Sequence, residues 1–446
     1  MKYKPMFTIS FLLFVLSCKT EVYKPIKIEN TMRVSTTARI SVKTYGAKGD
    51  GLADDAKAIQ QAIAANREIY FPKGNYLIKS FIEINQVSKL KITGESGAKI
   101  TTGLNKIFNI SGTIKSLEIS NIYFVSVKKS SVNDPEGLIN IANYGPADVM
   151  DSIVISNCNF SNPGTHANAI KLVSEGKNAV VKNIQIKNNH FEGIGRMGVE
   201  FQNHNRAPNI ARFRDYQISD NYFHDVGTIQ TGPAPVCISV SGYSVNGKIN
   251  HNEILDMHMS SSSYIYYGIE NAGTVGLETI GNHFKSISYG FTGILGSGPS
   301  AAESSATGQP IKSNWVIKDN LFELAGSSDK NKIRGMELWD LKSFTISGNT
   351  IRTDGMAIMF AGCNTGSISL NKATVKSGNA FYFKTGSTKN KIYQNTLDCS
   401  KATDNGVVLF DGASTSGNTA SQNVLIKTGN LPGRYVNING AINTTN

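Results

Sequence analysis

The sequence predicts an all-β solenoid, in which a single chain coils into a parallel β-helix with a short capping helix near its N-terminus. Three observations support this fold class: the composition, a recurring Asn motif, and the alternating apolar residues that precede each Asn. The 446 residues include 42 Gly but only 17% charged residues, which is typical of a β-rich, turn-rich extracellular protein. A repeat protein grows without splitting its core, so this length does not require several domains.

The recurring motif is an Asn with an apolar residue two positions later or directly after it, as in Asn189-His190-Phe191. At a coil corner, an Asn can adopt the left-handed conformation and bond its neighbours above and below. We therefore expect one stacked Asn per coil. The predicted ladder contains Asn121, Asn159, Asn189, Asn221, Asn252, Asn282, Asn320, Asn349, Asn371, Asn395 and Asn423.

The spacing of the motif predicts where the functional face lies. The step from Asn349 to Asn371 is only 22 residues, so a coil needs no more than that. Coils between Asn121 and Asn320 are longer, and extra residues in a solenoid emerge as loops on one face, often the binding face. We expect the site on the coils spanning roughly residues 130–340.

The N-terminal block begins with a run of small and acidic residues at 42–55. Residues 56–65 then fit a short amphipathic helix with Ile59 and Ile63 on one face, capped by Asp54 or Asp55. Residues 69–78 follow as strand, turn and strand.

Residues 42–78 together strongly resemble the opening of the pectate-lyase-like right-handed parallel β-helix superfamily, which includes polygalacturonases, alginate epimerases and phage tailspikes. The resemblance implies that the helix plugs the open end of the core and that Asp50, Asp54 and Asp55 are structural. It implies the fold and leaves the reaction open.

The first residues read as a targeting segment. Lys2 and Lys4 precede an apolar run at 6–16 that is too short to span a bilayer, and the run ends at Ser17-Cys18. This ending is similar to the lipobox of bacterial lipoproteins. We expect a signal peptide at 1–17, a tether at 18–38 lipidated on Cys18, and a β-helix domain at 39–446. The protein would then be an outer-membrane lipoprotein on the periplasmic or cell-surface side, held to the membrane by its lipid anchor only.

The charge points to an anionic partner. The formal net charge is +12, and removal of Lys2 and Lys4 with the signal peptide leaves +10. An acidic polysaccharide fits a basic exported protein. Nucleic acid is a poor candidate for the partner, because the chain lacks a nucleic-acid motif. The four remaining cysteines lie far apart without metal-site spacing, so we expect buried cysteines, no metal site and no required cofactor. The oligomeric state stays open.

A second strand in each coil carries the candidate chemistry. Side chains alternate across a strand, so the third residue of each Gly-apolar-x-apolar quartet should point outward. Glu200 and Glu270 lie two coils apart, as do Glu270 and Glu337, which is roughly 9.6 Å between backbones. Inverting glycosidases separate their carboxyl groups by roughly 6.5–9.5 Å. The expected outward column is Lys171, Glu200, Ser239, Glu270, Thr292, Glu337, Ala357, Tyr382 and Val408.

Basic and aromatic residues gather in the same coils and are candidates for substrate binding. Arg holds carboxylate or sulfate with paired hydrogen bonds, and Tyr and Trp stack on sugar rings. Tyr382 and Lys384 lie beyond the long coils, so we expect them outside the site. The candidates are Arg196, Arg206, Arg212, Arg214, Tyr264, Tyr266, Tyr267 and Trp339, with His204 as a further catalytic candidate.

The catalytic motifs of the best-studied relatives are missing. The polygalacturonase resemblance would imply Asn-Thr-Asp, Asp-Asp, Gly-His-Gly and Arg-Ile-Lys motifs, and none follows residue 78. The Asp-Pro-His motif of alginate epimerases is absent too. The reaction class therefore stays open from sequence.

Three functions remain. An inverting glycoside hydrolase would use Glu200, Glu270 and Glu337 as acid and base, one with its pKa raised by burial. A lyase acting by β-elimination would use Lys171, Arg196, His204 or a Tyr as base, with Arg or Ca²⁺ neutralising the uronate carboxylate. The third function is non-catalytic glycan binding.

Lipidation of Cys18 is directly testable. Changing Cys18 to Ala removes the acceptor thiol, so the variant should leave the membrane fraction for the soluble fraction on cell fractionation. Unchanged membrane association of the Cys18→Ala protein would contradict the lipid anchor.

Overall fold

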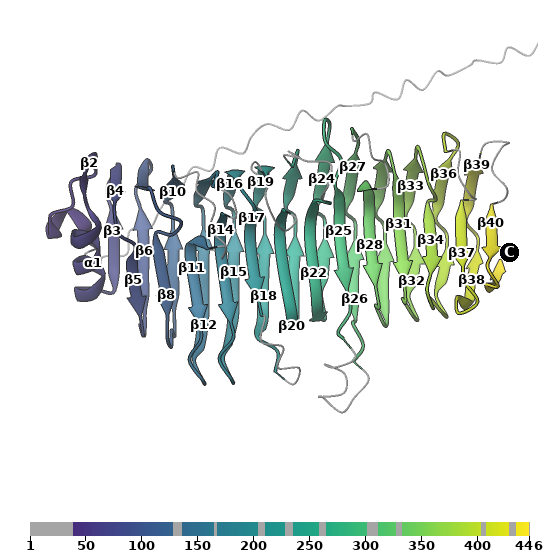
Figure 1. Cartoon of the computed structure of the whole chain (residues 1–446), viewed down its shortest axis with the longest axis horizontal. Helices are drawn as coiled ribbons and strands as arrows, with labels where there is room; N and C mark the ends of the chain where they lie inside the picture. Colours follow the sequence, from purple (N-terminus) through teal and green to yellow (C-terminus); the bar gives the residue numbers. More distant parts are fainter. Residues whose placement is uncertain are drawn as a thin grey trace, which may run out of the picture. The chain divides into compact units, whose positions relative to one another are not determined.

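The computed structural model describes residues 39–127, 136–164, 167–203, 210–227, 235–257, 265–300, 311–326, 332–402, 407–427 and 434–445. Arg39–Asn446 form one compact unit. Within it the strands stack side by side in chain order, from α1 (Ala56–Ala65) near one end to β40 (Tyr435–Ile438) near the other (Figure 1). This is the predicted right-handed parallel β-helix. Cys18, the signal peptide and the tether lie outside the described residues, and the predicted domain boundaries stay a prediction.

Three parallel ladders of strands make up the coils, and each coil contributes about one strand to each ladder. The first ladder contains β5 (Ile82–Asn85), β8 (Phe108–Ser111), β11 (Gly137–Asn143), β14 (Asn168–Ser174), β17 (Met197–Gln202), β20 (Val236–Asn250), β22 (Tyr267–Val275), β25 (Thr292–Ser297), β28 (Arg334–Trp339), β31 (Met356–Ala361), β34 (Phe381–Lys384), β37 (Val408–Asp411) and β40 (Tyr435–Ile438).

The second ladder follows the first in each coil and shares β20 with it. It contains β1 (Ile40–Ser41), β3 (Glu68–Phe71), β6 (Leu90–Gly94), β9 (Leu117–Ser120), β12 (Val149–Ser156), β15 (Val180–Lys187), β18 (Phe213–Ser219), β23 (Glu278–Ile280), β26 (Trp315–Lys318), β29 (Phe344–Ser347), β32 (Ser367–Ser369), β35 (Lys391–Tyr393), β38 (Ser416–Ser421) and β41 (Ile442–Thr445).

The third ladder forms a separate sheet. It contains β2 (Asp50–Asp54), β4 (Gly74–Ile78), β7 (Ala98–Thr102), β10 (Tyr123–Ser126), β13 (Asn159–Asn162), β16 (His190–Ile194), β19 (Tyr222–Val226), β21 (Glu253–Leu255), β24 (His283–Ser286), β27 (Leu321–Leu324), β30 (Thr350–Thr353), β33 (Lys372–Val375), β36 (Thr396–Cys399) and β39 (Val424–Lys427).

The long strand β20 joins the first two ladders into one sheet. Its first part pairs with β17 from Met197↔Val236 onward, and its second part pairs with β18 from Phe213↔Ser244 onward. Among the described residues this sheet has 27 strands and the sheet of the third ladder has 14. The first and second ladders therefore meet without a long connection in this coil.

The N-terminal cap matches its prediction. Helix α1 (Ala56–Ala65) follows the 3₁₀ helix η1 (Val42–Tyr45), and its Ile59 and Ile63 are buried. The Asp54 carboxylate accepts a hydrogen bond from the amide of Ala56, at the start of the helix. The Asp55 carboxylate instead accepts from two amides of the preceding loop. These contacts give both acids a structural role.

A ladder of stacked Asn side chains runs from Asn189 to Asn423. In each step, the Oδ1 atom of one Asn accepts from the backbone and side-chain amides of the Asn one coil earlier. Asn221 illustrates this, with N–Oδ1 distances of 3.1 Å and 3.0 Å to Asn252, while its own Nδ2 donates to the Ile186 carbonyl at 2.9 Å. The predicted ladder is confirmed over this length.

Two details of that prediction are wrong. The residue with left-handed φ is the one before the stacked Asn, such as Asp220 with φ 56°. Asn121 occupies this left-handed position, and Asn159 points outward in the third ladder beside Tyr123 and His190. Neither joins the ladder, because the bend comes one residue earlier than the stacked amide. Cys158 takes the ladder position and donates its backbone N–H to Asn189.

Stacked rings and small residues fill the core. Phe160, Phe191 and Phe223 stack almost in parallel, with ring centroids 5.0 Å and 4.5 Å apart. Cys158, Cys237, Cys363 and Cys399 are buried, as expected, and form no disulfide bonds. Burial raises the pKa of the Cys158 thiol to about 12, so it packs as a neutral side chain. No helix in the described part of the chain combines the length and apolarity needed to cross a membrane.

The Asn ladder predicts an asymmetric cost of two substitutions. Asn282→Ala leaves the Asn252 amide without its acceptor and the Ile249 carbonyl without its donor, all in a buried corner. A buried unsatisfied group costs about 1–3 kcal/mol, so denaturant unfolding should show a loss of at least about 2 kcal/mol. Asn159→Ala is the matched control, because this exposed Asn should lose less than about 0.5 kcal/mol. Equal losses for both variants would contradict the ladder.

Candidate functional site

The strand registers bring four of the predicted catalytic residues into one line on the outer face of the first ladder. Lys171 pairs with Glu200, Glu200 with Ser239, and Ser239 with Glu270. The line continues through Leu295 to Glu337. We call this line the outward column. Its members are Asn140, Lys171, Glu200, Ser239, Glu270, Leu295, Glu337, Met359, Tyr382 and Leu409.

Three positions of the expected column are wrong. Thr292 is in register with Tyr267, and Leu295 takes its place. Ala357 and Val408 are buried in the core, and Met359 and Leu409 stand in the column instead. At the corner before a strand, two successive residues can face the core, as Ala357 and Ile358 do. The position of a Gly or of the first apolar residue therefore does not determine which of the following residues point outward.

Glu200 lies in a buried polar cluster. Its carboxylate accepts a hydrogen bond from Asn168 Nδ2 at 2.7 Å and from the Arg196 guanidinium at 3.2 Å, and the Lys171 ammonium lies 3.9 Å away. All four side chains are at least nine-tenths buried. Two cations and an amide donor suit a negatively charged carboxylate in this position.

Two polar atoms of the same cluster make no hydrogen bond with the described residues. Arg196 Nε and Asn168 Oδ1 are buried, and neither has a hydrogen-bond partner among the described residues. Buried polar atoms are nearly always satisfied, so an unpaired donor and an unpaired acceptor beside one carboxylate mark a place for a further polar group.

Glu270 has a different environment. Its carboxyl accepts one hydrogen bond, from the Ser239 hydroxyl at 2.8 Å. Burial raises the pKa of Glu270. The Ser239 hydrogen bond and Arg196 oppose this shift, and the negative charge of Glu200 adds to it. Glu270 therefore holds a proton more readily than an ordinary Glu.

Two pairs of carboxyl groups are possible, Glu200 with Glu270 and Glu270 with Glu337, and they differ in the residue that lies between them. Ser239, a small side chain, separates Glu200 from Glu270 in the register. Leu295 separates Glu270 from Glu337 and fills the corresponding space with an apolar side chain. Only the pair of Glu200 and Glu270 has a small polar residue between its two carboxyl groups.

Glu337 is fixed from both sides. The Arg334 guanidinium forms an ion pair with one carboxylate oxygen, and Trp339 Nε1 donates to the other at 3.0 Å. Tyr267 is close to both neighbouring acids. Burial, followed by the charges of Glu337 and Glu270, raises the pKa of the Tyr267 phenol to about 12. The phenol therefore remains a proton donor at neutral pH.

Three predicted substrate-binding residues do not reach this face. Arg212 is fully buried and donates to the carbonyls of Gly176, Lys177 and Ala179, so its guanidinium holds a turn together. Arg214 belongs to β18 in the second ladder, and Tyr266 is buried in the core. A sequence cluster of Arg and Tyr does not show which side of a corner each residue occupies. His204, Arg206 and Tyr264 lie outside the described residues.

The sequence reasoning missed Asn168, Arg334 and Lys384. Asn168 and Arg334 each stand three residues before an outward-column member, just ahead of the corner, and the quartet pattern started one residue too late to include them. The Lys384 ammonium lies 5.0 Å from the ring centroid of Trp339, although the sequence placed it beyond the site.

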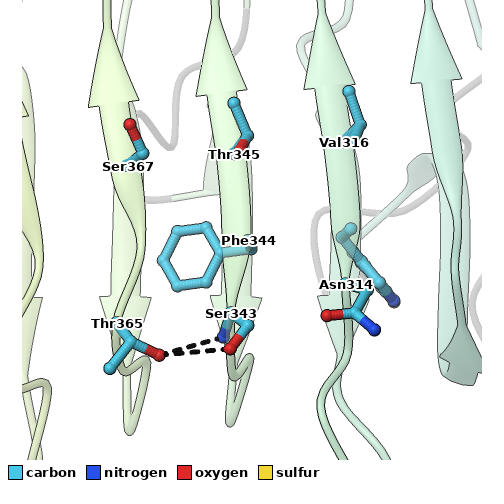
Figure 2. A pocket seen from close by; sticks show the side chains of 8 residues that line it. Asn314, Val316, Ser343, Phe344, Thr345, Thr365 and Ser367 are labelled. Carbon is cyan, nitrogen blue, oxygen red and sulfur yellow. Dashed lines mark hydrogen bonds between the residues drawn. The ribbon is translucent and has the colours of Figure 1, made fainter.

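Two surface cavities lie on the second ladder. One of about 400 Å³ is lined by Asn314, Trp315, Val316, Ser343, Phe344, Thr345, Thr365 and Ser367 (Figure 2). None of these lining residues is an Asp, Glu, His, Lys or Arg. The described residues also contain no group of three His, Cys, Asp or Glu side chains arranged to hold a metal ion. The cavity of Figure 2 thus lacks the carboxyl groups that the outward column provides.

The raised pKa of Glu270 predicts a pH-dependent stability. A carboxyl whose pKa is higher in the folded protein contributes stability at low pH that is lost as pH rises from its unfolded pKa through its folded pKa. Glu270→Gln removes this loss. The variant should therefore gain thermal stability relative to the parent protein at pH 7, and gain less at pH 4. A gain that is equal at both pH values would contradict the raised pKa.

Comparison with known proteins agrees with this architecture. The profile of the family described as "Rhamnogalacturonase A/epimerase, pectate lyase-like" matches residues 39–230, somewhat less than half of the chain. The plasmin and fibronectin-binding protein A of Streptococcus pneumoniae is 40% identical over 72 residues, which is 15% of this chain and only 10% of that protein.

Solved structures extend the likeness over most of the chain. The catalytic unit of a thermostable α-1,3-glucanase from Streptomyces thermodiastaticus superposes with a TM-score of 0.58 at 14% identity, covering 92% of this chain and 69% of the glucanase unit. The A-module of a mannuronan C-5 epimerase from Azotobacter vinelandii gives 0.53 at 14% identity, covering 90% and 98%. The chain therefore has the right-handed parallel β-helix fold of these structures, and its residues 39–230 are similar to the pectate-lyase-like family of the matched profile.

Proposed function

We propose that this protein is an inverting glycoside hydrolase that acts on an acidic polysaccharide, with Glu270 as general acid and Glu200 as general base. The observation that supports this most is the contrast between the two carboxyl groups. Glu200 faces two cations and an amide donor, whereas burial raises the pKa of Glu270. Two carboxyl groups in opposed environments are the usual arrangement for an acid and a base at one site.

The proposed reaction follows from these positions. Glu270 donates its proton to the glycosidic oxygen while the bond to the anomeric carbon breaks. A water held by Glu200 attacks that carbon from the opposite face and transfers a proton to Glu200. The two groups then exchange their protons with solvent. Ser239 orients Glu270 through its hydroxyl, and Arg196 and Lys171 hold the Glu200 carboxylate in position.

The spacing of the pair fits this role. Two coil rises put the Glu200 and Glu270 backbones roughly 9.6 Å apart. Inverting enzymes need roughly 6.5–9.5 Å between carboxyl groups to accommodate the water, and flexible Glu side chains supply the adjustment. The small Ser239 leaves space above the sheet between them. Glu337, behind Leu295 and paired with Arg334, contributes to substrate binding with Trp339 in this proposal.

Similarity supports the same class without naming the substrate. The matched family profile is described by rhamnogalacturonase and epimerase, and the superposed structures include a glucanase and an epimerase. The net charge of +12 favours an anionic glycan over a neutral one. The proposed location is outside the cytoplasm, with the lipid anchor on Cys18 as part of the proposal.

A β-eliminating lyase is the second candidate, favoured by the cations Lys171 and Arg196 on the outward face. Both cations already contact Glu200, so neither is available as a free base. The Tyr267 phenol, with a pKa of about 12, is a weak base at neutral pH. Ca²⁺ would belong to this alternative only. Glycan binding without cleavage remains the third outcome.

Exchange of each acid for its amide tests the hydrolase. Glu270→Gln and Glu200→Gln should each lower the release of reducing ends from uronate and sulfated polysaccharides by about 10²–10⁴-fold, because each removes one proton transfer. Glu278→Gln is the control, since this residue faces outward from the second ladder and should change the rate by less than about two-fold.

The product distinguishes the three functions. The hydrolase predicts new reducing ends without an ultraviolet-absorbing unsaturated sugar. Full activity of both Glu variants together with inactive Lys171 variants and an absorbing product would replace the hydrolase by the lyase. Tight binding with no product from any glycan would favour a binding protein.

A further inference from the structure

Beyond Glu270, the outer face of the first ladder changes from polar to apolar and aromatic. Leu295 and Met359 stand in the outward column on either side of Glu337. Trp339 lies two residues further along β28, and its neighbours in the register are the small residues Ser297 and Ala361. Trp339 is partly exposed, and neither of these small side chains is large enough to cover its ring.

The indole of Trp339 is held in place by a hydrogen bond to Glu337. Its Nε1–H donates to Glu337, and the other oxygen of that carboxylate pairs with Arg334. The hydrogen bond fixes the orientation of the ring before any ligand binds. Such a ring can stack on the C–H-rich face of a sugar.

Lys384 supplies an unmatched positive charge at this platform. The register runs from Trp339 through Ala361 to Lys384, so the lysine stands two coils beyond the ring. Its ammonium lies 5.0 Å from the ring centroid, a cation–π contact. Among the described residues no carboxylate pairs with it, whereas the charge of Arg334 is balanced by Glu337.

We propose that Trp339 stacks against one sugar of the polysaccharide and that Lys384 binds the carboxylate or sulfate of that sugar. Lys384 is then a specificity-determining residue for an acidic glycan. An anionic group forms a charge-assisted hydrogen bond with an ammonium, which is stronger than the partly exposed cation–π contact it replaces. The inference rests on the proposed function, in which the bound polysaccharide runs along the stacked coils.

The platform is separate from the proton-transfer pair. Trp339 lies two coils from Glu270, roughly 9.6 Å along the axis. Its contacts involve neither Glu200 nor Ser239. A change at Lys384 should therefore affect binding of the substrate and leave the chemical step intact.

The test measures binding in the Glu270→Gln background, so that cleavage does not interfere. The probes are polygalacturonate, alginate and dextran sulfate, each compared by affinity electrophoresis with a neutral counterpart: the carboxyl-reduced polymers and dextran. Lys384→Gln should weaken binding of the preferred acidic glycan about ten-fold and leave its neutral counterpart within two-fold. Lys384→Arg should retain most of the affinity, and Trp339→Ala should weaken both forms.

The outcomes separate the two proposals. In the parent enzyme, Lys384→Gln should raise KM with little change in kcat. Equal weakening of the acidic and neutral forms by Lys384→Gln, or no weakening of either, overturns the role of Lys384. Absence of binding to all three anionic glycans overturns it too. Selective binding that depends on Lys384, without hydrolysis by the parent protein, would reject the hydrolase and keep the acidic-sugar site.

Discussion

Parallel pairing between successive coils determines where each side chain of this protein lies. The coils repeat at roughly 4.8 Å, and each pairing fixes which residues share a line along the axis. The buried Asn ladder holds the corner, because each amide bridges to the coils before and after it. Residues as distant in sequence as Lys171 and Glu337 are aligned in one column on the same face by this register. A slip of one residue would bury the acids and expose the core.

The repeated architecture explains how similar side chains acquire different chemistry. Glu200, Glu270 and Glu337 occupy equivalent positions in their coils, so their backbones provide no distinction. The difference comes from the side chains beside each Glu, either in the adjacent coil or two to four residues away in its own coil. Arg196 and Lys171 balance Glu200, Ser239 alone bonds Glu270, and Arg334 with Trp339 holds Glu337. A solenoid can therefore diversify a site by single substitutions without changing its frame.

The fold was predictable from sequence because its determinants are local and repeated. The capping helix, the Asn motif and the alternating strands each carry a short-range signal, and the helix bounds of 56–65 were correct. The outward column was predictable where quartets had the common phase, as at Glu200 and Glu270. It failed at Thr292, where the strand enters its corner with a different phase, so the Gly pattern indicated the wrong residue. Contacts such as those of Lys384 with Trp339 depend on side chains two coils apart and leave no trace in local spacing.

The burial of Arg212 shows a second limit of the sequence. Charge suggests a surface residue, yet three turn carbonyls accept hydrogen bonds from the two terminal nitrogens of this guanidinium inside the fold. Composition alone does not distinguish an Arg that binds a substrate from one that closes a loop. The asymmetry of Glu200 and Glu270 is likewise a property of the assembled coils.

The central claim is that Glu200 and Glu270 act across a bound water. The most direct measurement is the anomeric configuration of the first product formed from a cleaved oligosaccharide, followed by proton nuclear magnetic resonance before mutarotation. The account predicts a new reducing end with the configuration opposite to that of the cleaved bond. Retained configuration, or an unsaturated sugar in place of a new non-reducing end, would contradict it.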